Sequence, residues 1–184
     1  RSDLTAITVG STAYIVGGFD GTRMDPEVLA STDGTAFRTV ANLPIPVRYA
    51  AVGYEGGDEW VFGGVTSTSE GGTLETSAIQ RVDPATGQAS VVGHLPQEMG
   101  HATAVTLNGQ VFVLGGRSGS TPSAAILRLD PAGPSVQPAG TLPQALSDAG
   151  SVVVGDQAYL VGGEVSGPTA PLDTVVVLKA ATGP

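Results

Sequence analysis

The stretch Asp3–Gly18, DLTAITVGSTAYIVGG, decides the fold, because units of the same length and pattern follow it three more times. The copies are Tyr49–Gly64 (YAAVGYEGGDEWVFGG), His101–Gly116 (HATAVTLNGQVFVLGG) and Asp148–Gly163 (DAGSVVVGDQAYLVGG). Each unit closes with a double glycine, and the closing glycines lie 46, 52 and 47 residues apart. A nearly fixed period in this range is typical of a propeller or a solenoid.

Each unit has the pattern of a β-hairpin. Its apolar residues recur with a period of two, and its middle is a pair of residues that favour positive φ and so close a two-residue turn. These pairs are Gly10-Ser11, Gly56-Gly57, Asn108-Gly109 and Gly155-Asp156. The sequence therefore predicts four tight hairpins in the same register.

The two strands of each hairpin differ in composition. The first is rich in small residues such as Ala50, Ala102 and Gly150, as expected of a strand crowded near a central axis. The second is apolar on both faces, as expected of a strand between two neighbouring sheets. It carries one aromatic column that we interpret as packing between sheets: Tyr14, Trp60, Phe112 and Tyr159.

A third and a fourth strand are expected after each hairpin. Third strands are predicted at 27–31, 78–82, 124–129 and 174–178. Turns that begin with Asp-Gly or Asp-Pro follow the first three of them. Fourth strands are predicted at 36–40, 88–92 and 135–139, each followed by Leu-Pro. The polar insert at 66–76 is predicted to be a loop.

Four antiparallel strands per repeat, with a small innermost strand and a double glycine after the second, resemble the kelch repeat. The resemblance covers nearly the whole chain and implies an all-β fold, a β-propeller built from four-stranded kelch-like blades. The blades would span about 3–44, 45–96, 97–143 and 144–184 of one domain. The sequence departs from the family pattern where the fourth strands begin, because a tryptophan usual there is replaced by residues such as Phe37, Ala89 and Val136.

The number of blades leaves three arrangements open. We count about four blades, of which the last is incomplete because it lacks a fourth strand. Kelch propellers usually have five to eight blades, and open sheet edges invite pairing with another chain. The chain is therefore expected to be a piece of a larger propeller, half of a ring completed by a second copy as a homodimer, or a closed four-bladed monomer.

Composition and charge exclude several classes of function. The net charge is −9 and Lys179 is the single lysine, so we expect no nucleic-acid partner, which would need clustered basic residues. No apolar run is long enough to span a membrane. We expect no cofactor. The chain has no cysteine, so we also expect no disulfide and no sulfur-bound metal. Among kelch-like enzymes, this excludes the oxidases that depend on a cysteine-modified tyrosine. The preference for Arg over Lys favours a GC-rich bacterial source.

Candidate binding residues lie on the face that carries the loops after each double glycine and the starts of the first strands. The first position of the four units is polar or aromatic in every copy, and in a ring these residues would converge around the axis. They are Asp3, Tyr49, His101 and Asp148. Other candidates on the same face are Arg48, Phe19, Arg23, Arg117 and Glu164. The alternative is that these are ordinary polar residues at strand starts, hydrogen-bonded to loop backbone.

Two classes of function follow from this site. The first is a non-catalytic propeller that binds a protein or a glycan partner through its loop face. The second is an enzyme that acts on a carbohydrate or small metabolite, with Asp3, His101 and Asp148 as acid and base groups. The sequence contains no catalytic constellation that favours the second.

Overall fold

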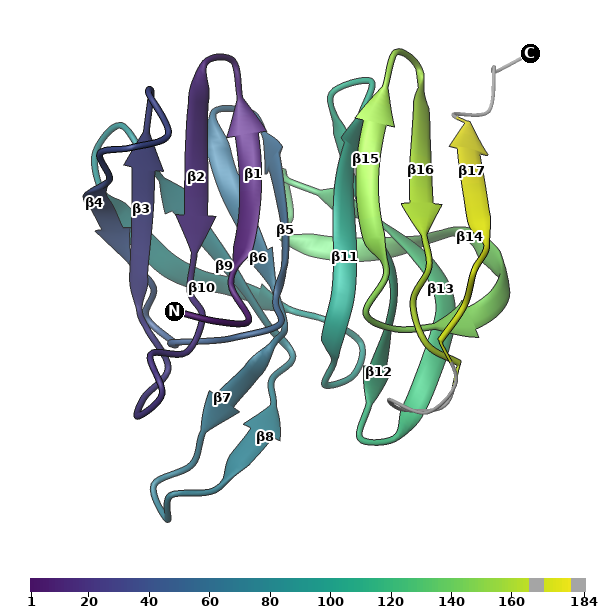
Figure 1. Cartoon of the computed structure of the whole chain (residues 1–184), viewed down its shortest axis with the longest axis horizontal. Helices are drawn as coiled ribbons and strands as arrows, with labels where there is room; N and C mark the ends of the chain where they lie inside the picture. Colours follow the sequence, from purple (N-terminus) through teal and green to yellow (C-terminus); the bar gives the residue numbers. More distant parts are fainter. Residues whose placement is uncertain (166–170, 180–184) are drawn as a thin grey trace.

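The computed structural model describes residues 1–165 and 171–179, and every regular element within them is a β-strand. The strands form four antiparallel sheets arranged as the blades of a propeller, with a small extra hairpin on one side (Figure 1). No helix of the described part is long and apolar enough to cross a membrane. The prediction of an all-β propeller is therefore confirmed.

Each blade is a meander of strands in chain order, with the first strand innermost. The first blade contains β1 (Thr5–Val9), β2 (Thr12–Val16), β3 (Glu27–Ser31) and β4 (Arg38–Asn42). The second contains β5 (Ala51–Glu55), β6 (Asp58–Phe62), β9 (Ala78–Asp83) and β10 (Gln88–His94). The third contains β11 (Gly100–Leu107), β12 (Gln110–Ser118), β13 (Thr121–Asp130) and β14 (Ser135–Leu146). The fourth contains, within the described residues, β15 (Gly150–Val154), β16 (Gln157–Val161) and β17 (Val175–Lys179).

The hairpin turns lie where the sequence predicts them, between the first and second strands of each blade. Two other local predictions are wrong. The insert at 66–76 is not only a loop, because it contains most of a hairpin, β7 (Val65–Ser67) and β8 (Thr73–Glu75). The outermost strands are also displaced or longer than predicted: β4 begins at Arg38, and β14 continues to Leu146 through Leu142-Pro143. Proline is tolerated in β14 because this strand is the edge of its sheet.

The core consists of three apolar layers, each between successive blades. The layer between the first two blades contains Val16, Val28, Val52 and Val61, and the next contains Trp60, Phe62, Val111 and Val113. The layer between the last two blades contains Leu114, Leu146 and Leu160. Because both faces of an inner blade are covered, its strands are apolar on both sides, as the sequence indicates.

The aromatic column behaves as expected in three of its four positions. Trp60 is buried in the core, and Tyr14 and Phe112 pack against the layers beside them. Tyr159 differs, since it lies on the face of the fourth blade that no described blade covers. Its hydroxyl donates to Gln157 Oε1 instead.

Candidate functional site

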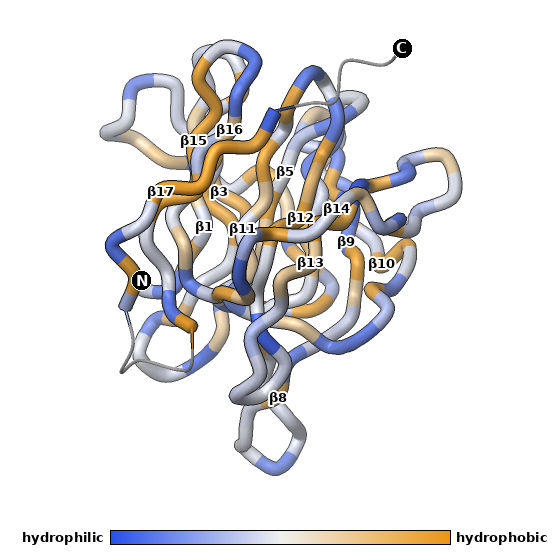
Figure 2. The backbone as a smooth tube through the Cα atoms, turned by 90° about the vertical axis from the view of Figure 1, so that its right-hand side faces the viewer, coloured by the Kyte–Doolittle hydropathy of each residue, from blue (hydrophilic) through white to orange (hydrophobic). Residues whose placement is uncertain are grey.

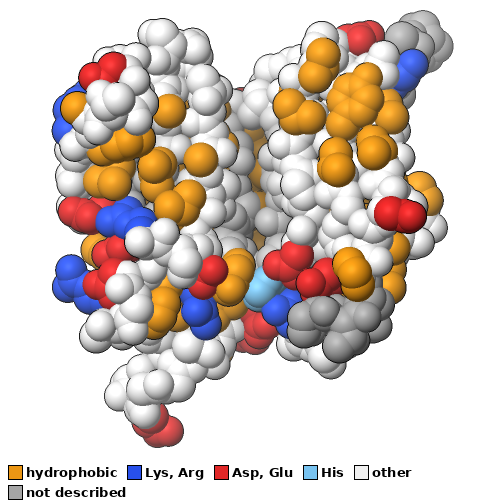
Figure 3. Space-filling model, in the orientation of Figure 1, with side chains coloured by type: hydrophobic (Ala, Val, Ile, Leu, Met, Phe, Trp, Pro, Cys, Tyr) orange, Lys and Arg blue, Asp and Glu red, His pale blue; other side chains and the backbone are white. Residues whose placement is uncertain are grey.

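A central cavity of about 940 Å³ runs between the innermost strands of the four blades. Residues of β1, β5, β11 and β15 line it, most of them small or hydroxylated. The space-filling view shows this cavity as a groove between the first and fourth blades (Figure 3). The first residues of the four units lie at one end of the groove, here called the mouth.

The four mouth residues share an unusual backbone conformation. Asp3, Tyr49, His101 and Asp148 have φ of 58°, 54°, 60° and 57°. This left-handed region is uncommon for residues other than glycine and costs about 1–2 kcal/mol each. Such strain concentrates at functional sites. The alignment of the units places these residues in one column, but it gives no sign of the strain.

A series of backbone hydrogen bonds joins the blades at the mouth. The N–H groups of Tyr49, His101 and Asp148 each donate to the carbonyl oxygen of the preceding mouth residue, all at 2.9 Å. The four residues are therefore fixed relative to one another by their backbone. Their side chains are free to contact a ligand or one another.

Arg48 connects the first two blades at the mouth. Its Nη1 donates to Asp3 Oδ2 at 3.2 Å, and its guanidinium lies 5.1 Å from the ring centre of Phe19 and 5.3 Å from that of Tyr49. Both distances are within the range of cation–π attraction. Phe19, Arg48 and Asp3 are thus brought together as part of one cluster.

His101 connects the second blade with the fourth. Its ring stacks on that of Tyr49, with centroids 4.1 Å apart, and its Nδ1 lies 2.7 Å from Asp148 Oδ1. Arg117 Nη2 lies 2.8 Å from His101 Nε2. An arginine can only donate, so Nε2 accepts, and the ring proton is assigned to Nδ1, which donates to Asp148. The imidazole at the centre of the mouth thus has a hydrogen-bond partner at both of its ring nitrogens.

Asp148 is held ionised by its neighbours. Burial tends to raise its pKa, but hydrogen bonds from His101 and Ser147 and the nearby charge of Arg117 outweigh burial and lower the pKa below its usual value. Ser147 Oγ donates to Asp148 Oδ2 at 2.9 Å. Because this serine contacts the carboxylate rather than the imidazole, the three residues do not have the geometry of a nucleophilic triad.

The inserted hairpin forms a wall beside the mouth. A smaller cavity of about 350 Å³ lies between β8 and the mouth residues, and Glu75, Arg48, Tyr49, His101 and Arg117 line it. It offers two guanidinium groups, a carboxylate and an aromatic edge within one space. The insert at 66–76 was expected to lie on this face as a loop. Its hairpin was not predicted, because a single insert without a repeat partner gives no alignment signal.

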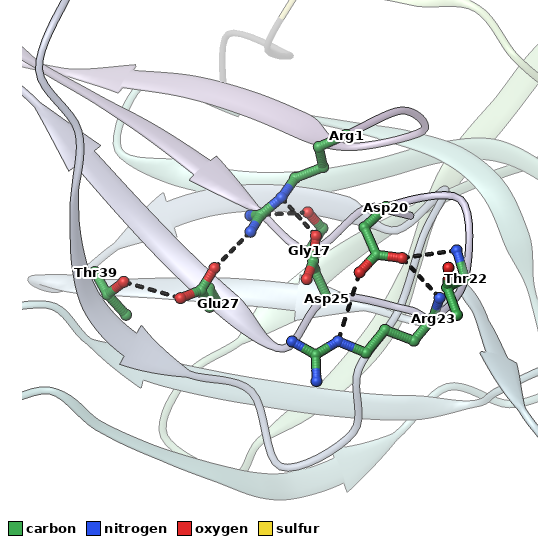
Figure 4. Close-up of polar contacts among 8 residues, drawn as sticks. All are labelled: Arg1, Gly17, Asp20, Thr22, Arg23, Asp25, Glu27 and Thr39. Atoms are coloured by element: carbon green, nitrogen blue, oxygen red, sulfur yellow. Dashed lines mark hydrogen bonds and ion pairs between the residues drawn. The ribbon is translucent and has the colours of Figure 1, made fainter.

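Two of the predicted residues lie apart from this cluster. Arg23 pairs with Asp20, Nε to Oδ2 at 3.6 Å, on an exposed loop of the first blade (Figure 4). The same view shows Arg1 fixed between Asp25 and Glu27. The second residue is Glu164, whose backbone exchanges two hydrogen bonds with that of Ser147. This places Glu164 beside the mouth but outside the cluster of side-chain contacts. Ser147 was missed, although it precedes the first unit residue just as Arg48 does.

Within residues 1–165 and 171–179, no three His, Cys, Asp or Glu side chains lie close enough together to hold a metal ion.

Comparisons with known proteins agree with this architecture. A family model described as "Kelch motif" matches residues 99–142. The chain is 26% identical over 125 residues to "Kelch repeat and BTB domain-containing protein 12" of Danio rerio, covering 63% of this chain but only 20% of that protein. A solved structure titled "Structure of YjhT" superposes on all of this chain with a TM-score of 0.79 at 21% identity. The match covers 66% of the chain in that structure. The chain is thus a β-propeller of four described sheets with a kelch motif in its third blade.

Proposed function

We propose that the protein is a non-catalytic binding module that takes a protein or a glycan partner at the mouth. The observation that carries this proposal is the convergence of Asp3, Arg48, Tyr49, His101 and Asp148 beside two cavities. The kelch propeller fold suits a binding or scaffold role. The specific site and the class of partner are our inference from the side chains present.

The chemistry of the mouth suits a partner with both polar groups and a flat apolar surface. Arg48 and Arg117 supply planar donors for carboxylate or hydroxyl oxygens, and Glu75 supplies an acceptor. The stacked Tyr49 and His101 rings supply a rigid aromatic edge. Rigid aromatic and arginine anchors dominate the binding energy of many interfaces.

Tyr49→Ala is expected to weaken partner binding at least about tenfold, since truncating an aromatic hot-spot residue costs about 2 kcal/mol or more. The variant removes the ring between Arg48 and His101 and leaves the backbone bonds in place. A glycan array and a displayed peptide library would supply the ligands, and calorimetric titration of the best ligand would give the affinity.

Phe37→Ala is the matched control, because Phe37 is an aromatic residue that is 43% exposed and lies outside the mouth. It is expected to leave the affinity unchanged. Equal affinities of wild type and Tyr49→Ala would contradict the proposed site.

A second candidate function is acid–base catalysis on a sugar or small metabolite. The His101–Asp148 contact at 2.7 Å favours it, because a carboxylate that orients an imidazole is a common catalytic pair. Arg117 occupies Nε2 and Arg48 pairs with Asp3, so both arginines would have to move for proton transfer. Turnover of a sugar panel followed by NMR, lost in His101→Gln, would support catalysis over binding alone.

We further propose that additional blades complete the open ring, supplied by a second copy of the chain as a homodimer or by another set of blades. The uncovered outer faces of the first and fourth blades support this proposal. A completed ring would enclose the cavity at the mouth and hold the first and fourth blades in position.

A further inference from the structure

Equivalent residue pairs show that the fourth blade has an uncovered face. Here the forward face of a blade is the side turned toward the next blade in the chain, and the back face is the opposite side. On each forward face, a residue of the second strand pairs with one of the third: Val16 with Val28, Phe62 with Ile79, Leu114 with Ile126 and Val161 with Val175. The first three pairs belong to the layers between blades. Val161 and Val175 are 50% and 56% exposed.

The rest of this forward face is also apolar and uncovered. Val152, Tyr159 and Val177 are register partners across β15, β16 and β17, so they share the face with the exposed valine pair. Val154 lies on the same side, two residues beyond Val152. The apolar strip runs along β17 in Figure 2 and appears as the upper right patch in Figure 3. A contiguous exposed apolar patch of this kind marks an interaction surface.

The first blade has the complementary uncovered face. Ile15 pairs with Leu29 on its back face, and both are only partly buried. The residues equivalent to Ile15 in the later blades, Val61, Val113 and Leu160, are at most 1% exposed because the preceding blade covers them. The row of blades therefore presents a forward face at one end and a back face at the other, each of the type that packs on a further blade.

The match to the solved propeller indicates how many blades fit between these two faces. The four blades match 66% of that chain, and a chain of that length built only of such blades would hold about six, a number within the usual range for propellers. Two more blades would fill the remaining third. A second whole copy would bring four blades and require a ring of eight.

We propose that a unit of two kelch-like blades docks between the forward face of the fourth blade and the back face of the first, and closes a six-bladed ring. This inference rests on the proposed ring closure and specifies its partner. The docked unit presents a back face to Val161 and Val175 and a forward face to Ile15 and Leu29. It also closes the open side of the central cavity.

The test is a chain extended with its own blades. After Lys179 it carries a copy of residues 131–147, which supply the turn and outer strand of the third blade, and then a copy of residues 3–96, the first two blades. Light scattering after size exclusion should show a monomer, and the thermal midpoint should lie above that of the 184-residue chain. The added interfaces bury the exposed valines, and apolar burial stabilises the fold.

Val161→Glu distinguishes docking from a merely longer chain. In the 184-residue chain the position is exposed, so the thermal midpoint should change by less than about 2 °C. In the extended chain the charge would be buried without a partner, and the midpoint should fall by about 5 to 10 °C. Leu74→Glu, the same type of change at a residue of the β7–β8 hairpin that is 43% exposed, should have little effect in either chain.

Three results would overturn the proposal. One is an extended chain whose thermal midpoint is no higher than that of the 184-residue chain. Another is a Val161→Glu change that lowers the midpoint of the extended chain no more than that of the 184-residue chain. The third is a 184-residue chain with twice the mass of 18.3 kDa that Val161→Glu returns to a monomer, since a second copy would then cover the face. Partner affinity at the mouth is measured separately with Tyr49→Ala, so failure of the six-bladed ring and failure of the binding site can be told apart.

Discussion

Gly63→Ala is expected to destabilise the protein by about 2–5 kcal/mol, or to prevent folding. Gly63 is the first glycine of the second double glycine, and its φ is +59°. A β-carbon there would overlap the carbonyl oxygen of Met99 and lie 3.1 Å from that of Thr76. Left-handed backbone costs about 1–2 kcal/mol for a residue with a β-carbon, and overpacking adds about 1–3 kcal/mol.

The Met99 carbonyl cannot easily move aside, because it accepts a 2.8 Å hydrogen bond from Gly64 N–H. Met99 is buried in the layer between the second and third blades, so a shift would also disturb that layer.

Denaturant unfolding of wild type and Gly63→Ala measures the loss in the free energy of unfolding. Gly57→Ala is the control, because Gly57 has a positive φ of 98° with open space around it. It is expected to lose only about 1–2 kcal/mol. Equal losses for the two variants would mean that backbone strain alone, and not the close approach of the next blade, requires glycine at position 63.

The double glycines illustrate what could be predicted from the sequence. Their spacing predicts repeats, and the hairpin turns between them predict strand pairs, because both depend on local backbone preferences. The reason for glycine at position 63 lies in a carbonyl 36 residues later in the chain, at Met99. Contacts between blades of this kind are not encoded in any single repeat and become visible only in three dimensions.

The candidate site was predictable to the extent that it follows the repeat. Alignment places Asp3, Tyr49, His101 and Asp148 at equivalent positions, and the backbone hydrogen bonds between them follow from this equivalence. The contacts of Arg117 were not predictable, although Arg117 follows its double glycine just as Phe19 and Glu164 do. Alignment gives the position of a residue and not the direction of its side chain. Glu75 lies on the inserted hairpin and has no aligned counterpart, so its place beside the mouth was not predictable either.

The second blade also carries a buried carboxyl group that the repeat pattern does not require. Glu59 is fully buried, and neither of its side-chain oxygens has a hydrogen-bond partner among the described residues. The equivalent residues of the other blades are Ala13, Val111 and Ala158. Burial raises the pKa of Glu59 from 4.5 to about 7, and Glu59 in turn contributes to the raised pKa of Tyr14 on the facing blade.

The sign of the effect on stability follows from this raised pKa. Below pH 4.5 Glu59 is protonated in both the folded and the unfolded chain, so its ionisation does not change the free energy of unfolding. Between pH 4.5 and about 7 the unfolded chain releases the proton while the folded chain keeps it, so stability falls as the pH rises. Above pH 7 both forms are ionised, and the accumulated loss is about 3 kcal/mol.

Glu59→Gln is therefore expected to stabilise the protein by up to about 3 kcal/mol at pH 8 and by much less at pH 5. The variant keeps the size of the side chain and removes its charge. Urea unfolding of both proteins at the two pH values measures the difference.

Glu98→Gln, at an exposed position, controls for the loss of one negative charge from a chain of net charge −9. A gain from Glu59→Gln that is the same at pH 5 and pH 8 would show that the carboxyl group does not titrate between these values in the folded protein. The gain would then not come from the removal of a buried charge.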